Sequence, residues 1–97
     1  MATYILLATY TEQGLKGIKD TVKRTESVRA LAKKAGLTMK ESYWTLGQYD
    51  VVATFEAPDD DTMTAFSLSV AKLGNVKTQT LRAFSATDMA GIVGKMV

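Results

Sequence analysis

The order of hydrophobic patterns along the chain restricts its fold more than any other feature of the sequence. Runs rich in β-branched and aromatic residues, typical of strands, alternate with stretches in which apolar residues recur every three or four positions, as on one face of a helix. The order is strand, helix, strand, strand, helix, strand, at residues 3–10, 15–35, 37–46, 49–56, 63–73 and 76–84. This order predicts an α+β domain of the ferredoxin-like βαββαβ type, a sandwich of one sheet and two helices.

Connectivity rules predict how these elements pack. Strand–helix–strand crossovers are right-handed, which places both helices on one face of a four-stranded antiparallel sheet. The first and third strands are expected in the middle of the sheet. The last strand is expected at an edge, where Lys77 and Arg82 discourage pairing with another chain.

The length of 97 residues suits one domain with one modest core, so residues 1–97 are expected to fold as a single unit. Residues 86–97 form a C-terminal tail in which Thr87 or Asp88 is expected to cap a short helix. Two glycines weaken this helix, so it is expected to gain stability only by docking on another surface. Its apolar side consists of Met89, Ile92, Val93 and Met96.

The first helical pattern contains a weak point. Thr25 interrupts its apolar stripe, and a bend or break is expected between residues 20 and 27. Gly36 suits the position just after the helix, where a positive φ ends it. The stripe consists of Leu15, Ile18, Val22, Val28, Leu31 and Ala35.

The turn between the second and third strands predicts how their side chains pair. Gly47-Gln48 suits a two-residue type II′ turn, because glycine adopts the positive φ that this turn needs. In the resulting register Trp44 pairs with Val51, and successive side chains alternate between the two faces. The face expected under the helices carries Trp44, Leu46, Tyr49, Val51, Ala53 and Phe55. The opposite face carries Glu41, Tyr43, Thr45, Asp50, Val52, Thr54 and Glu56.

Two helices can cover only one face of such a sheet. The other face would expose more apolar surface than a monomer usually does, so a closed homo-oligomer is expected. Both a barrel-like dimer of face-to-face sheets and an edge-to-edge trimer remain open. Where two sheets meet incompletely a ligand pocket remains, lined here by Tyr43, Thr45, Asp50 and Thr54; alternatively, these residues only form the contact between subunits.

Composition excludes several kinds of chemistry. The chain has no cysteine and no histidine, which rules out a cysteine nucleophile, a disulfide, a thiolate zinc site, a Ser-His-Asp triad and histidine ligation of haem or iron. Apart from residues 59–61, which follow Pro58 as a helix start, the carboxylates are scattered, so neither a metal site nor a cofactor is expected. Any catalysis would depend on Tyr, Asp, Glu, Lys or Arg side chains.

Charge and hydropathy limit the expected partners. Twelve basic and 10 acidic residues give a net charge of +2, too balanced to indicate nucleic-acid binding, and the basic stretch at residues 16–40 is expected to be a solvated helix face. Residues 1–10 lack the basic region and cleavage site of a signal peptide, and no apolar run is long enough to span a bilayer. We expect a cytoplasmic protein whose partners are itself and a small molecule, with no nucleic acid and no membrane.

The hairpin resembles the GYD domain family, which is named for a Gly-Tyr-Asp motif at this turn. The corresponding residues are Gly47, Tyr49 and Asp50, with Gln48 inserted. The resemblance covers nearly the whole chain, through residues 10–11, 14, 19–20, 24, 43–52, 55–60, 73–76 and 80–84. It implies a ferredoxin-like domain related to the dimeric α/β-barrel group. It implies no reaction, because barrels of that group include haem enzymes, cofactor-free monooxygenases and ligand-sensing domains.

Six side chains are candidates for ligand binding. Asp50 is expected to bind the backbone of a neighbouring loop, to pair with a cation or to act as a general base. Arg24 and Lys19 lie where the first helical pattern weakens, so they are placed to rim a pocket and meet an anion. Trp44 and Tyr49 are expected in the core. The candidates are Asp50, Tyr43, Thr45, Arg24, Lys19 and Arg82.

Three functions remain open at this point. The first is a homo-oligomeric domain that binds a small molecule or an anion on the open sheet face. The second is a small cofactor-free enzyme, of the oxygenase or isomerase type, with Asp50 and Tyr43 in acid–base roles. The third is a structural assembly protein. A closed pocket containing Asp50, Tyr43 and an arginine would favour the first two, whereas a filled sheet face without a cavity would favour the third.

Overall fold

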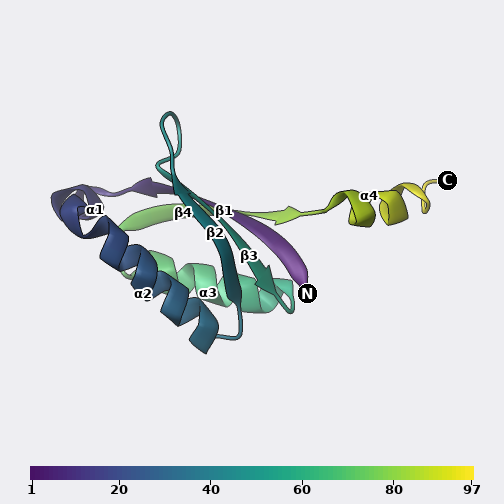
Figure 1. Ribbon diagram of the computed structural model, residues 1–97, viewed down its shortest axis with the longest axis horizontal. Helices are drawn as coiled ribbons and strands as arrows, with labels where there is room; N and C mark the ends of the chain where they lie inside the picture. The colour runs from purple at the N-terminus through teal and green to yellow at the C-terminus, as the bar shows by residue number, and fades with distance from the viewer.

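The predicted element order is present in the computed structural model, which describes residues 1–97 (Figure 1). The strands are β1 (Ala2–Tyr10), β2 (Thr38–Trp44), β3 (Val51–Ala57) and β4 (Val76–Ala83). The helical elements are α1 (Glu12–Lys16), the 3-10 helix η1 (Ile18–Asp20), α2 (Thr21–Lys34), α3 (Asp60–Lys72) and α4 (Ala86–Val93). No helix is both long and apolar enough to cross a membrane.

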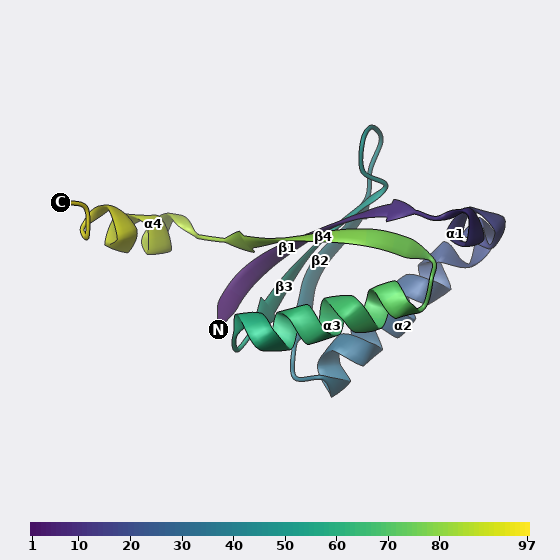
Figure 2. The ribbon, with the colours of Figure 1, turned by 180° about the vertical axis from the view of Figure 1, so that it is seen from behind.

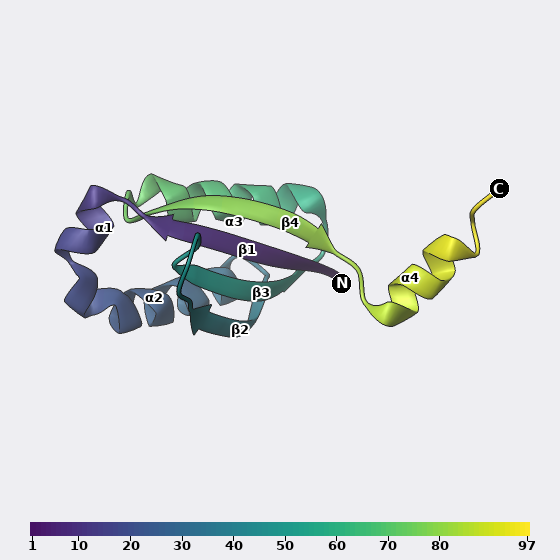
Figure 3. The ribbon, with the colours of Figure 1, turned by 90° about the horizontal axis from the view of Figure 1, so that it is seen from above.

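The four strands form one antiparallel sheet in the order β2-β3-β1-β4, so β1 and β3 are central, as predicted. Helices α2 and α3 lie on one face of this sheet (Figures 1 and 2). Seen from the other side, the strands lie in front of both helices, and no helix covers this face, in front of which only the β2–β3 loop stands (Figure 3). The predicted ferredoxin-like α+β fold is therefore confirmed.

The core lies between the sheet and the helices. Alternate side chains of β1 and β3 point into it, and Phe55 meets Phe66 of α3 with ring centroids 5.2 Å apart. The absence of any buried charged residue shows that burial of apolar surface stabilises this interior. The core residues are Tyr4, Leu6, Ala8, Ala32, Leu37, Met39, Ala53, Phe55, Ala57, Met63, Phe66 and Val70.

The first helical pattern breaks earlier than predicted. The chain bends at Gly17 and passes through η1 before α2 begins at Thr21. This bend turns the predicted stripe away from the sheet, so the prediction that Leu15, Ile18 and Val22 are buried is wrong, and all three are exposed. The side of α2 that faces the sheet instead carries Thr21, Thr25, Val28 and Ala32, whose spacings of four, three and four fit one helix face.

The β2–β3 hairpin has the predicted register but a wider turn. Trp44 pairs with Val51, and Gly47 has the expected positive φ of 108°. The last hydrogen bond joins the Thr45 amide to the Asp50 carbonyl (2.9 Å), so residues 46–49 form a loop and not a two-residue turn. This loop stands away from the sheet on the side opposite the helices (Figure 1).

Two side chains predicted in the core lie outside it. Tyr49 is half-buried outside the core, and its hydroxyl donates to Gln79 Oε1 of β4 (3.1 Å), because the strand alternation used to place it ends before the loop. Trp44 is 45% exposed, because β2 is an edge strand with a neighbour on one side only. Leu46, assigned to the same face, is fully exposed at the loop tip.

The C-terminal helix stands clear of the rest of the molecule (Figures 1 and 3). Its N-cap is Ser85, not the predicted Thr87 or Asp88, and Ser85 and Asp88 form a reciprocal capping box. None of its residues is buried. The predicted tail helix therefore forms, but it docks on no surface of its own chain.

Candidate functional site

A cavity of about 290 Å³ lies between the sheet and the helices. Its walls come from β1, β2, β3, α2 and α3, together with the loop that leads into β4. It lies under the face of the sheet that the helices cover, opposite the open face on which a ligand was expected. Most of its lining is apolar, so a bound molecule would be held largely by burial of apolar surface.

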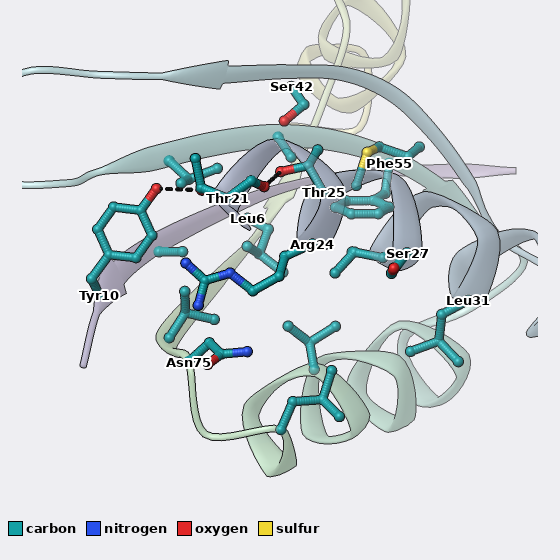
Figure 4. A pocket seen from close by; sticks show the side chains of 18 residues that line it. Leu6, Tyr10, Thr21, Arg24, Thr25, Ser27, Leu31, Ser42, Phe55 and Asn75 are labelled. Carbon is teal, nitrogen blue, oxygen red and sulfur yellow. Dashed lines mark hydrogen bonds between the residues drawn. The ribbon is translucent and has the colours of Figure 1, made fainter. Parts of the chain in front are cut away.

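The larger polar side chains of the lining lie at one end of the cavity, whereas Ser27 lies beside Leu31 and Ser42 lies near Phe55 (Figure 4). Tyr10, Arg24 and Asn75 lie together there, whereas Phe55 and Leu31 lie toward the other end. The cavity therefore has a polar end with one charged side chain, and a mainly apolar remainder that includes two serine hydroxyls.

Arg24 is the one charged residue that lines the cavity. Its Nη2 donates to the Gly14 carbonyl (3.0 Å), which fixes the guanidinium beside α1. It has no ion-pair partner, since the ion pairs of the chain join Lys16 to Glu12 and Lys40 to Glu56. The site consequently carries a single, uncompensated positive charge.

A close backbone approach forms the wall beside Arg24. A Cβ on Gly14 would overlap the Asn75 carbonyl oxygen, so only glycine fits there without a shift. Thr11 joins the same two segments, because its amide donates to the Asn75 carbonyl (3.1 Å) and its hydroxyl to the Gly74 carbonyl (2.6 Å). The segment after β1 and the segment before β4 are thus locked together at the polar end.

Asp50 holds the end of β1. Its Oδ2 accepts from the Tyr10 backbone amide (2.9 Å), and its own amide donates to the Ala8 carbonyl (2.9 Å). The structure therefore shows the first of the three predicted roles of this carboxylate, which is to bind the backbone of a neighbouring segment.

Thr21 links the strand ends to α2. Its hydroxyl pairs with the Tyr10 hydroxyl (2.8 Å) and accepts from Trp44 Nε1 (3.0 Å). The hairpin that resembles the GYD motif is therefore connected to the cavity wall through Asp50, Tyr10 and Thr21. Through these hydrogen bonds the hairpin holds Tyr10 and Thr21 in their positions on the cavity wall.

Ser42 contributes the one buried side-chain oxygen without a hydrogen-bond partner. It lies on β2, opposite Ala53, and lines the cavity. An unsatisfied buried hydroxyl is costly, so this side of the cavity wall is also polar enough to meet a guest or a water molecule.

The remaining candidates lie apart from the cavity. On the open face, the Tyr43 hydroxyl donates to Glu41 Oε2 (2.6 Å), and this hydrogen bond raises the pKa of Tyr43. Thr45 donates to the Tyr49 carbonyl (2.6 Å) in the hairpin loop. Lys19 is exposed on η1. Of the six candidates, only Arg24 lines the cavity.

Arg82 belongs to a separate cluster at the edge strand β4. Its guanidinium lies 4.6 Å from the ring centroid of Phe84 and 5.5 Å from that of Tyr4, within the range of a cation–π contact. It also donates to the backbone carbonyls of Thr3 and Ala83. Its contacts with the protein account for its position without a ligand.

Several lining residues were missed from the sequence: Tyr10, Thr21, Thr25, Ser42 and Asn75. Thr21 and Thr25 could have indicated the cavity from the sequence, because they lie one helical turn apart on either side of Arg24 and so place polar groups on one helix face. The sequence pattern predicts a weak point of the helix at these polar residues, whereas in the structure they line the cavity.

Solved structures with a similar fold support the architecture. The protein FFRP-DM1 matches with a TM-score of 0.64 and 21% identity, over 87% of this chain and 100% of its own. The hypothetical protein PHS023 from Pyrococcus horikoshii matches with 0.63 and 21%, over 88% and 92%. TTHA0845 from Thermus thermophilus matches with 0.58 and 23%, over 89% and 96%. At these identities the likeness concerns the fold alone.

Sequence comparison identifies the family. None of the curated proteins compared with the chain matches it. The family model described as the GYD domain matches residues 4–93, which include the hairpin, the Gly14 contact and the whole cavity lining. The resemblance seen in the hairpin is thereby confirmed over nearly the full length, and the chain belongs to the GYD domain family.

Proposed function

We propose that this chain is a homo-oligomeric domain that binds a small molecule in the cavity between its sheet and its helices. The observation that carries the proposal is the cavity itself. The whole core consists of 12 buried residues, yet about 290 Å³ beside it is left unfilled. A ligand in this space would bury the apolar side chains that line it, which is a favourable contribution to binding.

Binding is better supported than catalysis. An acid–base role would need titratable groups that face the ligand, but the cavity lining includes no carboxylate. Asp50 is engaged with the Tyr10 amide, and Tyr43 lies on the opposite face of the sheet. The alternative of an enzyme that uses these two residues therefore has less support than a binding domain.

Self-association is supported by the uncovered face of the sheet. Ile5, Leu7, Val52, Leu81 and Tyr43 lie side by side there on four strands, and we call them the open-face patch. Leu81 and Tyr43 are exposed in the single subunit. A second copy packed on this patch would bury it, and the cavity on the other face would remain free for a ligand.

Native mass spectrometry of the protein purified from its natural source tests both parts together. The expected spectrum contains a multiple of the 10.5 kDa subunit that carries an additional small-molecule mass. An oligomer without extra mass would contradict ligand binding, and bare subunits at every concentration would contradict both parts.

A cavity-filling variant provides the control. Val28 lines the cavity, so Val28→Phe is expected to remove the additional mass without dissociating the oligomer. Val22→Phe, on the exposed side of the same helix, is expected to retain it. Retention of the extra mass by Val28→Phe would place the ligand elsewhere.

A further inference from the structure

We infer that the ligand is an organic acid, with an apolar body and one anionic group that Arg24 binds at the polar end of the cavity. The inference rests on the proposed function, because it requires that the cavity holds a ligand. It goes further by naming the chemical class of that ligand and the residue that selects it.

The single positive charge in the cavity lining is the first reason to expect an anionic ligand. Arg24 is half-buried, is the only charged residue of the lining and has no ion-pair partner. Withdrawing a charge from water is costly unless a group of opposite sign or several hydrogen bonds compensate it. Here the protein supplies one hydrogen bond, from Nη2 to the Gly14 carbonyl. An anionic ligand would supply the missing partner.

The hydrogen-bonding capacity beside Arg24 also suits an anion. A guanidinium has five N–H donors in a planar fork that fits a carboxylate, and only one of them is used by the protein. The Asn75 side chain accepts from Gln13 Nε2 through its oxygen (2.9 Å), which leaves its amide nitrogen as a further donor on the cavity wall. The polar end therefore offers donors from two side chains to one group.

The rest of the cavity restricts the body of the ligand. Phe55 and Leu31 lie away from the polar end (Figure 4), and no charged side chain lies near them in the lining. A lone cation matches a singly charged carboxylate better than a doubly charged phosphate ester. An aliphatic or aromatic monocarboxylic acid fits both ends of the cavity.

Isothermal titration calorimetry with three probes tests the inference. Octanoate has both the acid and the apolar body, octanamide lacks the charge, and acetate lacks the body. We expect octanoate to bind at least about tenfold more tightly than octanamide, from the loss of charge-assisted hydrogen bonds, and acetate to bind most weakly.

Two variants assign the effect to its residue. Arg24→Gln is expected to remove the preference for octanoate over octanamide. Lys23→Gln, which removes the same charge from the exposed neighbouring position, is expected to keep it. Binding of octanamide by Arg24→Gln shows that its cavity is intact. If that variant does not fold, the comparison of octanoate with octanamide in the natural sequence decides alone.

The outcomes separate this inference from the proposed function. Equal affinities for octanoate and octanamide would overturn the acid preference while supporting the cavity as a binding site. An acid preference that Lys23→Gln abolishes as fully as Arg24→Gln does would overturn the assignment to Arg24. No binding of either eight-carbon probe at millimolar concentration would overturn the inference, and the additional mass in the native spectrum would still decide the proposed function by itself.

Discussion

Asp50 shows how a motif residue can position the wall of a cavity that it does not line. Its carboxylate accepts the Tyr10 amide, and the Tyr10 hydroxyl meets Thr21 on the cavity wall. A hydrogen bond to a carboxylate is stronger than one between neutral groups, so this contact is well suited to fix the end of β1. The position of Tyr10, and with it the polar end of the cavity, depends on Asp50.

Asp50→Ala is expected to destabilise the domain by about 1–3 kcal/mol, because it leaves the half-buried Tyr10 amide without an acceptor. Urea denaturation measures the loss. Asp50→Asn keeps an acceptor oxygen and is expected to lose less. If Asp50→Ala retained full stability but bound no ligand, the carboxylate would be a ligand-binding group and the positioning role would be wrong.

Gly14 makes an equally specific prediction. In Gly14→Ala the new Cβ overlaps the Asn75 carbonyl oxygen, so one of the two backbone segments must move. A thermal melt is expected to show a loss of about 1–3 kcal/mol, typical of overpacking. Gly17→Ala is the control, because the nearest atom lies at 3.7 Å and its cost is expected to be much smaller. Equal effects of the two substitutions would contradict the close approach.

Among single residues the sequence identified few of those at the cavity, since only one of the six candidates lines it. Gly47 adopts the positive φ expected of a turn glycine, and Arg24 lines a cavity as expected of a rim residue. The side on which the cavity lies was not predictable, because it depends on the bend at Gly17, and the helical period gave no signal there. The Gly14 contact joins segments some 60 residues apart in sequence and leaves no local pattern.

Among the elements, α3 begins with an aspartate cap. Asp59 Oδ1 accepts from the Thr62 backbone amide (2.8 Å), and this hydrogen bond lowers the pKa of Asp59 below its ordinary value of 3.8. Because folding lowers this pKa, the stabilisation is present above the unfolded value and is lost as the pH falls through the folded value.

Asp59→Asn is therefore expected to change the pH dependence of folding. Asparagine also caps helices but does not titrate, so the variant is expected to be less stable than the natural sequence near pH 7 and to approach it below about pH 3. Urea denaturation at several pH values measures this convergence. Asp61→Asn, which removes a carboxylate from the same turn but not from the cap, serves as the control. A constant difference at every pH would contradict the assigned cause.

The elements were largely predictable because their patterns are local. The four strands and both packed helices follow from hydrophobic period, glycine positions and the helix start after Pro58. The hairpin register was also correct, since Trp44 pairs with Val51. The placement of Tyr49 was wrong, because strand alternation ends before the loop. Trp44 lies on the predicted face, where its Nε1 donates to Thr21 of α2, but on an edge strand it remains partly exposed.

At the scale of the whole molecule, two apolar surfaces have no partner within the chain. One is the open-face patch, and the other is the exposed side of α4, which includes Met89, Ile92 and Val93. A helix of eight residues is marginal in water by itself, even with the Ser85–Asp88 capping box. Association with a second molecule would bury the apolar side chains of both surfaces.

Leu7→Lys tests whether the open-face patch is an interface between copies. Leu7 lies on the central strand β1 between Val52 and Gln79, so a lysine there would place a charge in the middle of the contact. Burial of an unpaired charge is costly, and we expect the dissociation constant of the oligomer to rise at least about thirtyfold, equivalent to about 2 kcal/mol.

Sedimentation equilibrium over a wide concentration range measures the effect. Leu68→Lys, on the exposed side of α3, makes the same chemical change away from the patch and is expected to leave the oligomer intact. The side chain of Leu7 points away from the core, so the variant subunit is expected to keep its circular dichroism spectrum. A natural sequence that remains monomeric at high concentration would show that this face tolerates water, and the homo-oligomer would have to be abandoned.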